Sequence, residues 1–80
     1  MNENADDWKD NAMVAYRTAF SALQTRWGNP ATDVGRYCAE ELKEVLLDLK
    51  QALIDDDQVR AMAAMAEINV LWAELEEEER

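Results

Sequence analysis

The sequence contains no histidine, one cysteine, one proline and two glycines among its 80 residues. Without histidine, neither the Ser–His and Cys–His pairs of nucleophilic enzymes nor the Glu-x-x-His set of di-iron bundles can be assembled. The aspartates at 55–57 do not open an EF-hand loop, because Arg60 stands where that loop requires glycine. We therefore predict a protein that is not an enzyme and that holds no metal or cofactor.

Positive charge is also scarce. Eight Lys and Arg stand against 18 Asp and Glu, which gives a net charge of -10. Such a field repels nucleic acid and anionic membranes, and it attracts basic surfaces with fast, salt-sensitive encounter. These numbers predict a basic protein surface as partner, with no direct binding to nucleic acid or membrane.

Neither a secretion signal nor a membrane span is predicted from the sequence. The first ten residues lack a basic start followed by an apolar run, and no segment approaches the roughly 20 apolar residues that cross a bilayer. Cys38 has no second cysteine with which to form a disulfide, which suits a reducing compartment. We expect a cytoplasmic protein.

Apolar residues make up 49% of the chain and include three tryptophans, which is typical of a folded protein and not of an acidic tail. We expect one helical domain over residues 1–80, with frayed ends at 1–5 and 79–80. A core at this length is only marginally sufficient, so self-association or a partner is expected to add stability.

Apolar periodicity predicts an all-α fold, an antiparallel bundle of three helices over about residues 6–27, 30–53 and 57–78. In the first helix, apolar residues recur at steps of three and four, which is typical of an amphipathic helix. This apolar stripe includes Trp8, Tyr16, Phe20 and Trp27. Gly28 is expected in a left-handed conformation after that helix, with Asn29 as the next N-cap and Pro30 at the first helical position.

The second helix carries its own apolar stripe, given by Val34, Cys38, Leu42, Val45, Leu46, Leu49 and Leu53. Cys38 is expected to be a buried small hydrophobe, and Gly35 is expected where the first helix approaches closely. The third helix is apolar around most of its circumference, with Met62, Met65, Ile68, Leu71 and Trp72 spread over more than one face. Trp72 therefore belongs either to the core or to an interface.

Two acidic stretches stand out, the run at Asp55–Asp56–Asp57 and the C-terminal glutamates. Asp55 and Asp56 are expected to form a turn, and Asp57 is expected to cap the third helix. On the second helix, Glu40, Glu44 and Asp48 recur at every fourth residue, about 6 Å apart along the axis, a distance comparable to that between phosphates of one nucleic-acid strand. The expected partner-binding residues are Glu40, Glu44, Asp48, Asp55, Asp56, Trp72, Glu74, Glu76 and Glu77.

These acids have two possible explanations. An acidic helix face is often only a solvated face, and a terminal glutamate run is often a frayed end. Negative charge at a helix C-terminus opposes the helix dipole, which favours a role outside folding. The sequence leaves a docking surface and a solvated surface both open.

A very small, strongly acidic, histidine-free helical protein resembles the phage-encoded inhibitors of bacterial defence, including anti-CRISPR proteins, many of which imitate nucleic acid. The resemblance rests on size and charge over the whole chain, and no motif assigns a role to a residue. It implies an inhibitor that occupies the Lys- and Arg-lined DNA channel of an effector complex, such as a CRISPR effector, in the host cytoplasm, and excludes DNA. The alternative is a homodimeric helical bundle, joined through the helix at 57–78, with a structural or adaptor role.

Overall fold

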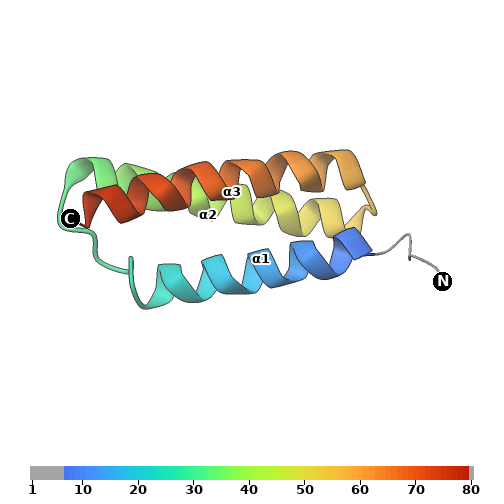
Figure 1. The fold of residues 1–80 in the computed structure, drawn as a ribbon, viewed down its shortest axis with the longest axis horizontal. Coiled ribbons are helices and arrows are strands. Elements are labelled where there is room, and N and C mark those ends of the chain that lie inside the picture. The colour runs from blue at the N-terminus through green and yellow to red at the C-terminus, as the bar shows by residue number, and fades with distance from the viewer. Residues whose placement is uncertain (1–6, 80) are drawn as a thin grey trace.

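The computed structural model describes residues 7–79 and contains three helices, α1 (Asp7–Gln24), α2 (Asp33–Ile54) and α3 (Gln58–Glu78), as Figure 1 shows. Each helix runs antiparallel to the one before it, and the bundle measures 46 × 21 × 18 Å. Residues 7–79 contain no strand. The predicted all-α, three-helix bundle is confirmed, while the fraying expected at 1–5 and at residue 80 lies outside the described residues.

The connection between α1 and α2 differs from the prediction. It spans residues 25–32, and the N-cap of α2 is Thr32, whose side chain accepts a hydrogen bond from the backbone N–H of Gly35 at 2.9 Å. The predictions of Asn29 as N-cap and of a helix that starts at Pro30 were wrong. A threonine hydroxyl satisfies the same free N–H groups, and here it lies where α2 begins.

The chain leaves the α1 geometry after Gln24 and still buries Trp27, whose backbone N–H donates to the carbonyl of Ala22 at 2.8 Å. Gly28 does not have the predicted positive φ. A Cβ there would lie 3.2 Å from the carbonyl oxygen of Gln24, so close backbone packing explains the glycine. Helix one was therefore predicted about three residues too long.

The core combines large side chains with many alanines. Its buried hydrophobic members are Trp8, Ala12, Ala19, Ala22, Leu23, Trp27, Cys38, Ala39, Leu42, Leu46, Leu49, Ala52, Ala61, Ala64, Ile68, Leu71 and Leu75. Contact is most extensive between α2 and α3, and α1 packs less extensively against both. Small residues let helix axes approach closely, because the distance between axes follows the size of the side chains at the contact.

Phe20 and Val34, both predicted to be core residues, are exposed. In α1 the buried face is set by Ala19 and Leu23, and Phe20 lies beside it and stacks on Tyr16, with ring centroids 5.9 Å apart. A helix turns 100° per residue, so a position adjacent to the stripe can fall on its edge. The prediction that Tyr16 belongs to the core holds in part, because this side chain is partly buried against it.

Gly35 is buried, but its close neighbours are not in the first helix as predicted. A Cβ at this position would meet the Thr32 hydroxyl at 3.0 Å, Pro30 at 3.3 Å and Glu78 of α3 at 3.8 Å. The glycine therefore lets the connection 25–32 and the end of α3 pack over the first turn of α2.

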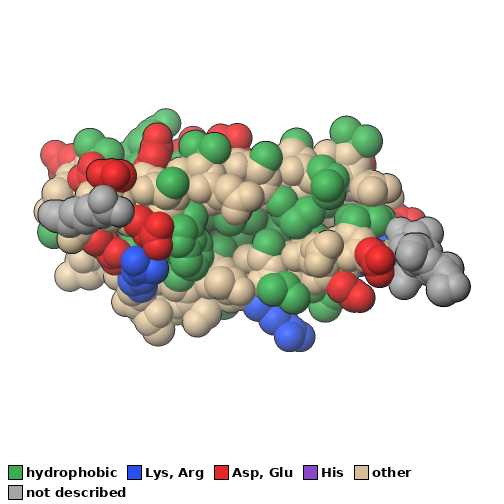
Figure 2. All heavy atoms as spheres, viewed as in Figure 1, with side chains coloured by type: hydrophobic (Ala, Val, Ile, Leu, Met, Phe, Trp, Pro, Cys, Tyr) green, Lys and Arg blue, Asp and Glu red, His purple; other side chains and the backbone are tan. Residues whose placement is uncertain are grey.

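The outer side of α3 is apolar and uncovered within the described part of the chain. Ile68 and Leu71 are buried, and Met65 and Trp72 pack partly buried against the core. Met62, by contrast, is 51% exposed, and Val59 and Val70 are 81% and 56% exposed. Hydrophobic side chains accordingly appear along the upper edge of Figure 2, where α3 lies. None of the helices within residues 7–79 is long and apolar enough to cross a membrane.

We predict that Leu46→Ala destabilises the fold more than Phe20→Ala. Leu46 is 3% exposed and Phe20 is 45% exposed. Truncation of the buried leucine should lower the free energy of unfolding by about 2–5 kcal/mol, and truncation of the half-exposed phenylalanine by about 1–2 kcal/mol. Urea denaturation of the two variants measures this difference, and an equal or larger loss for Phe20→Ala would contradict the described core.

Candidate functional site

Each aspartate of the acidic run at 55–57 has a structural role. Asp55 ends α2, and Asp56 follows with a positive φ of 59°. The N–H of Asp57 donates to the Ala52 carbonyl at 2.9 Å, and that of Asp56 donates to the Leu53 carbonyl at 3.3 Å. This pair of bonds around a left-handed residue is a Schellman motif, in which glycine is usual and a short polar residue is tolerated.

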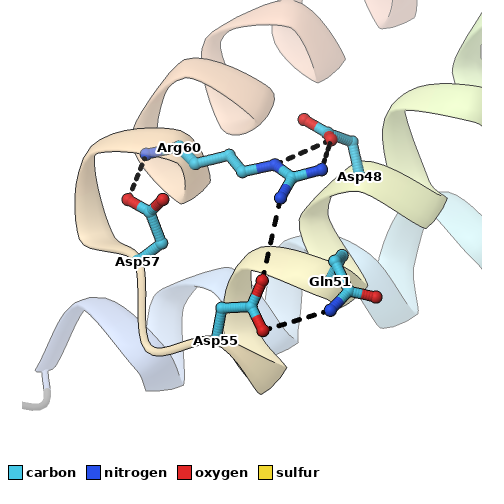
Figure 3. A network of polar contacts seen from close by, with 5 residues as sticks. All are labelled: Asp48, Gln51, Asp55, Asp57 and Arg60. Carbon is cyan, nitrogen blue, oxygen red and sulfur yellow. Dashed lines mark hydrogen bonds and ion pairs between the residues drawn. The ribbon is translucent and has the colours of Figure 1, made fainter.

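Arg60 binds the same run together with α2 (Figure 3). Its guanidinium donates to Asp48, with Nε 2.8 Å from Oδ1, and its Nη1 lies 3.8 Å from Oδ2 of Asp55. Its backbone N–H donates to Asp57 at 3.1 Å, which confirms Asp57 as the N-cap of α3. Gln51 completes the network by donating to Asp55 at 3.1 Å. The hydrogen bond with Asp48 raises the pKa of Arg60.

The opposite end of the bundle has a similar arrangement around Arg26. Its Nε and Nη2 donate to the carboxylate of Glu79 at 3.0 and 2.7 Å, and Nη2 lies 3.5 Å from Glu76. The guanidinium also lies over the ring of Trp27, 4.8 Å from its centroid. Hydrogen bonding from Arg26 lowers the pKa of Glu79. Glu79, expected to be frayed, instead links the end of α3 to the residues that follow α1.

Trp72 belongs to this end as well. Its ring packs edge-on against Trp27 with centroids 4.6 Å apart, and it is partly buried against the core. Of the two roles that the sequence left open for Trp72, the structure therefore shows internal packing.

Two further glutamates of α3 bond across the seam to α2 and its cap. The Thr32 hydroxyl donates to Glu78 at 2.7 Å, and the Cys38 thiol donates to Glu74 at 3.3 Å. Burial, together with the nearby Glu74 carboxylate, raises the pKa of Cys38 to about 11. Cys38 is thus the buried, protonated thiol that its place in the apolar stripe predicts.

Several predicted partner-binding residues are therefore engaged within the fold. Asp48 and Asp55 bind Arg60, Asp56 lies 2.9 Å from Lys9, and Glu76 faces Arg26. On the face shown in Figure 2, acidic side chains gather at the two ends of the bundle. The turn predicted at Asp55 and Asp56 is therefore confirmed, whereas the contacts of the terminal glutamates with Arg26 were not predicted.

The structure brings a different set of carboxylates together along the α2–α3 seam. A shallow groove of about 410 Å³ is lined by Glu41, Glu44 and Asp48 from α2 and by Glu67 from α3. Glu44 and Asp48 were predicted, whereas Glu41 and Glu67 were missed. Glu40 lies on the other flank of α2, in a hollow with Arg36 and Lys43.

Among the described residues, Glu41, Glu44 and Glu67 make no hydrogen bond or ion pair, and Glu40 makes none either. Glu41 precedes Asp48 by seven residues, so helical spacing alone places the two on the same side of α2. The approach of Glu67 depends on how α3 packs, for which the sequence contains no local signal. We name Glu41, Glu44 and Glu67 the acidic seam.

Residues 7–79 contain no group of three or more His, Cys, Asp or Glu side chains that could hold a metal ion. The comparisons with known protein families, with curated proteins and with solved structures gave no match. A functional interpretation therefore has to rest on the surface of this chain itself.

We predict that Asp56→Gly is more stable than Asp56→Ala by about 1 kcal/mol, because a left-handed conformation costs an L-residue with a Cβ roughly that amount. Both variants lose the contact with Lys9, so their difference isolates the backbone. Chemical denaturation gives the two free energies of unfolding. Equal stabilities would show that position 56 does not adopt the left-handed conformation.

Proposed function

We propose that this protein is a non-enzymatic inhibitor that binds the basic nucleic-acid-binding surface of a target, such as a CRISPR effector complex, and excludes DNA. Its site of action would be the cytoplasm, that of the host if a phage encodes it. The observation that supports this most directly is the acidic seam. Glu41, Glu44 and Glu67 lie together on one groove, and no cation among residues 7–79 pairs with them.

The electrostatics of the seam suit such a partner. Exposed carboxylates that are already ion-paired have less to offer an incoming lysine or arginine, because a partner has to compete with the internal cation. Asp48 and Asp55 both pair with Arg60, whereas the carboxylates of the acidic seam pair with no cation of the described residues. Glu44 and Asp48, which both line this groove, lie about 6 Å apart along α2, a distance comparable to that between phosphates of one nucleic-acid strand.

Binding of this kind gains its rate from long-range attraction. A net charge of -10 on an 80-residue chain steers the protein to a basic site, and the counterions of that site are displaced on binding. The same excess keeps the protein away from DNA, so it would compete with DNA for one surface without binding it.

We predict that Glu41→Gln combined with Glu44→Gln weakens inhibition of DNA binding by a susceptible effector about five- to tenfold at low salt, and less at high salt because the field is screened. The assay is a mobility shift of target DNA with purified, guide-loaded CRISPR effector complexes and increasing amounts of the protein. A thermal melt should show the double variant folded, because neither side chain makes a hydrogen bond or ion pair within residues 7–79.

A matched control is Asp7→Asn combined with Asp10→Asn, which removes two charges from the first turn of α1. This variant should inhibit within about twofold of the unchanged protein. An equal loss of inhibition in both double variants would show that net charge, and not the acidic seam, is responsible. If the unchanged protein inhibits none of the effectors, the proposal is wrong.

The second candidate is a homodimer through α3, which the exposed Val59, Met62 and Val70 on its outer side favour. An uncovered apolar helix face is stabilised when a second copy covers it. In that case the charge would serve solubility alone, and the role would be structural or that of an adaptor.

We expect sedimentation equilibrium to separate the two candidates in part. If α3 forms the interface, the protein should sediment at twice its 9.2 kDa mass, and Val70→Ser should shift it to the monomer. Leu47→Ser is the control, since it changes a residue of similar exposure on α2. A monomer at high concentration would exclude the dimer.

A further inference from the structure

A second surface, on the opposite flank of α2 from the acidic seam, has a different character. Two open hollows of about 510 and 620 Å³ lie between α1 and α2 and adjoin at Tyr16, which lines both; we call the two together the groove. Its apolar lining is exposed at several points, chiefly at Met13, Phe20, Leu47 and Ile54.

Three cations accompany this groove. Arg17 and Lys50 line the first hollow, and Lys43 lines the second. No carboxylate of the described residues forms an ion pair or hydrogen bond with any of the three.

The other cations of the described residues are all paired. Among residues 7–79, Lys9 contacts Asp56, Arg26 contacts Glu79, Arg36 contacts Asp33, and Arg60 contacts Asp48. In a chain with 18 acidic residues, the described Lys and Arg side chains that lack an acidic partner thus gather on one groove. Within residues 7–79, this groove therefore combines cations that have no acidic partner with exposed apolar side chains.

The sequence itself keeps carboxylates away from two of these cations. Residues three and four positions away on a helix are surface neighbours. For Lys50 these neighbours are Leu46, Leu47, Leu53 and Ile54, and for Arg17 they are Met13, Val14, Phe20 and Ser21. Neither cation has an acidic residue within this reach, although acids are the commonest charged residues of the chain.

We propose that the groove between α1 and α2 docks an amphipathic helix of another protein, one with an apolar stripe flanked by carboxylates. Apolar side chains of that helix would cover Met13, Phe20, Leu47 and Ile54, and its carboxylates would meet the unpaired cations. Lys43 and Lys50 are seven residues apart on α2, which is about 10.5 Å along the axis, so two acids seven residues apart on the ligand would match them.

Such a site is independent of the inhibitory surface proposed above, because it selects a partner of opposite charge and uses the other flank of α2. The simpler alternative is that the aliphatic stems of Arg17, Lys43 and Lys50 only shield apolar surface from water. In that case, the position of acids on a ligand helix would not matter.

The test uses a synthetic helical peptide of about four turns with a leucine stripe and glutamates seven residues apart on its flank. The control peptide has the same composition with its glutamates moved to the face opposite the leucines. We expect the flanked peptide to bind about tenfold more tightly at low salt, measured by calorimetry, with the preference lost at high salt. Amide shifts in NMR spectra should cluster on α1 and α2 around Tyr16 and Leu47.

Lys50→Gln should reduce the preference for the flanked peptide severalfold, while Arg36→Gln, which removes a cation already paired with Asp33, should leave it unchanged. Glu41→Gln combined with Glu44→Gln should also leave it unchanged, which separates this site from the acidic seam. Equal binding of both peptides, equal effects of Lys50→Gln and Arg36→Gln, or shifts centred on α3 would overturn the proposal. Concentration-dependent shifts at the groove without peptide would do so as well, by showing that a second copy covers it.

Discussion

The closest association in this bundle is between α2 and α3, and the position of α1 depends on it. Buried alanines on both helices, among them Ala52 and Ala64, thin the side-chain layer between them, so the two helices form a close hairpin. α1 lies on this hairpin through Trp8 near its start, through Trp27 just after its end, and through small residues such as Ala12 between them. Less extensive packing of α1 leaves an apolar groove beside α2.

Two arginines determine where many of the acidic side chains lie. Arg60 gathers acidic groups from α2 and from the turn at one end of the bundle, and Arg26 holds the end of α3 at the other. The acidic residues of the described chain therefore form two groups. Those that contact Arg26 or Arg60 hold the ends of the bundle together, and those of the acidic seam have unpaired carboxylates. The two flanks of α2 consequently differ in sign, which a net charge of -10 alone conceals.

The local parts of this structure could be predicted from the sequence, and the long-range parts could not. The N-cap Asp57 and the buried Cys38 were predictable, because capping and stripe position depend on neighbours in the chain. Phe20 was wrongly predicted to be buried, because the packing of the other helices decides whether a residue next to an apolar stripe is buried or exposed.

The same limit applies to the candidate site. Asn29 and Thr32 are both residue types that favour an N-cap position. Thr32 is the cap in a structure where Trp27 is buried and Gly35 packs against α3, and neither contact can be read from the local sequence. The contact between Arg26 and Glu79 joins residues 53 positions apart, and Glu67 reaches Glu41 only through the α2–α3 packing. No periodicity within one helix encodes such pairings.

The contact between Trp27 and Trp72 has an optical consequence. Two indole rings with centroids 4.6 Å apart and planes at 80° are close enough for their excited states to couple. Coupled indoles give a paired positive and negative band in the far-ultraviolet circular dichroism spectrum, superimposed on the helix bands, so it appears as a difference between the unchanged protein and a Trp72→Phe variant. One ring belongs to the chain after α1 and the other to α3, so this couplet reports whether α1 is docked on the hairpin. The protein thus carries its own spectroscopic probe of that attachment.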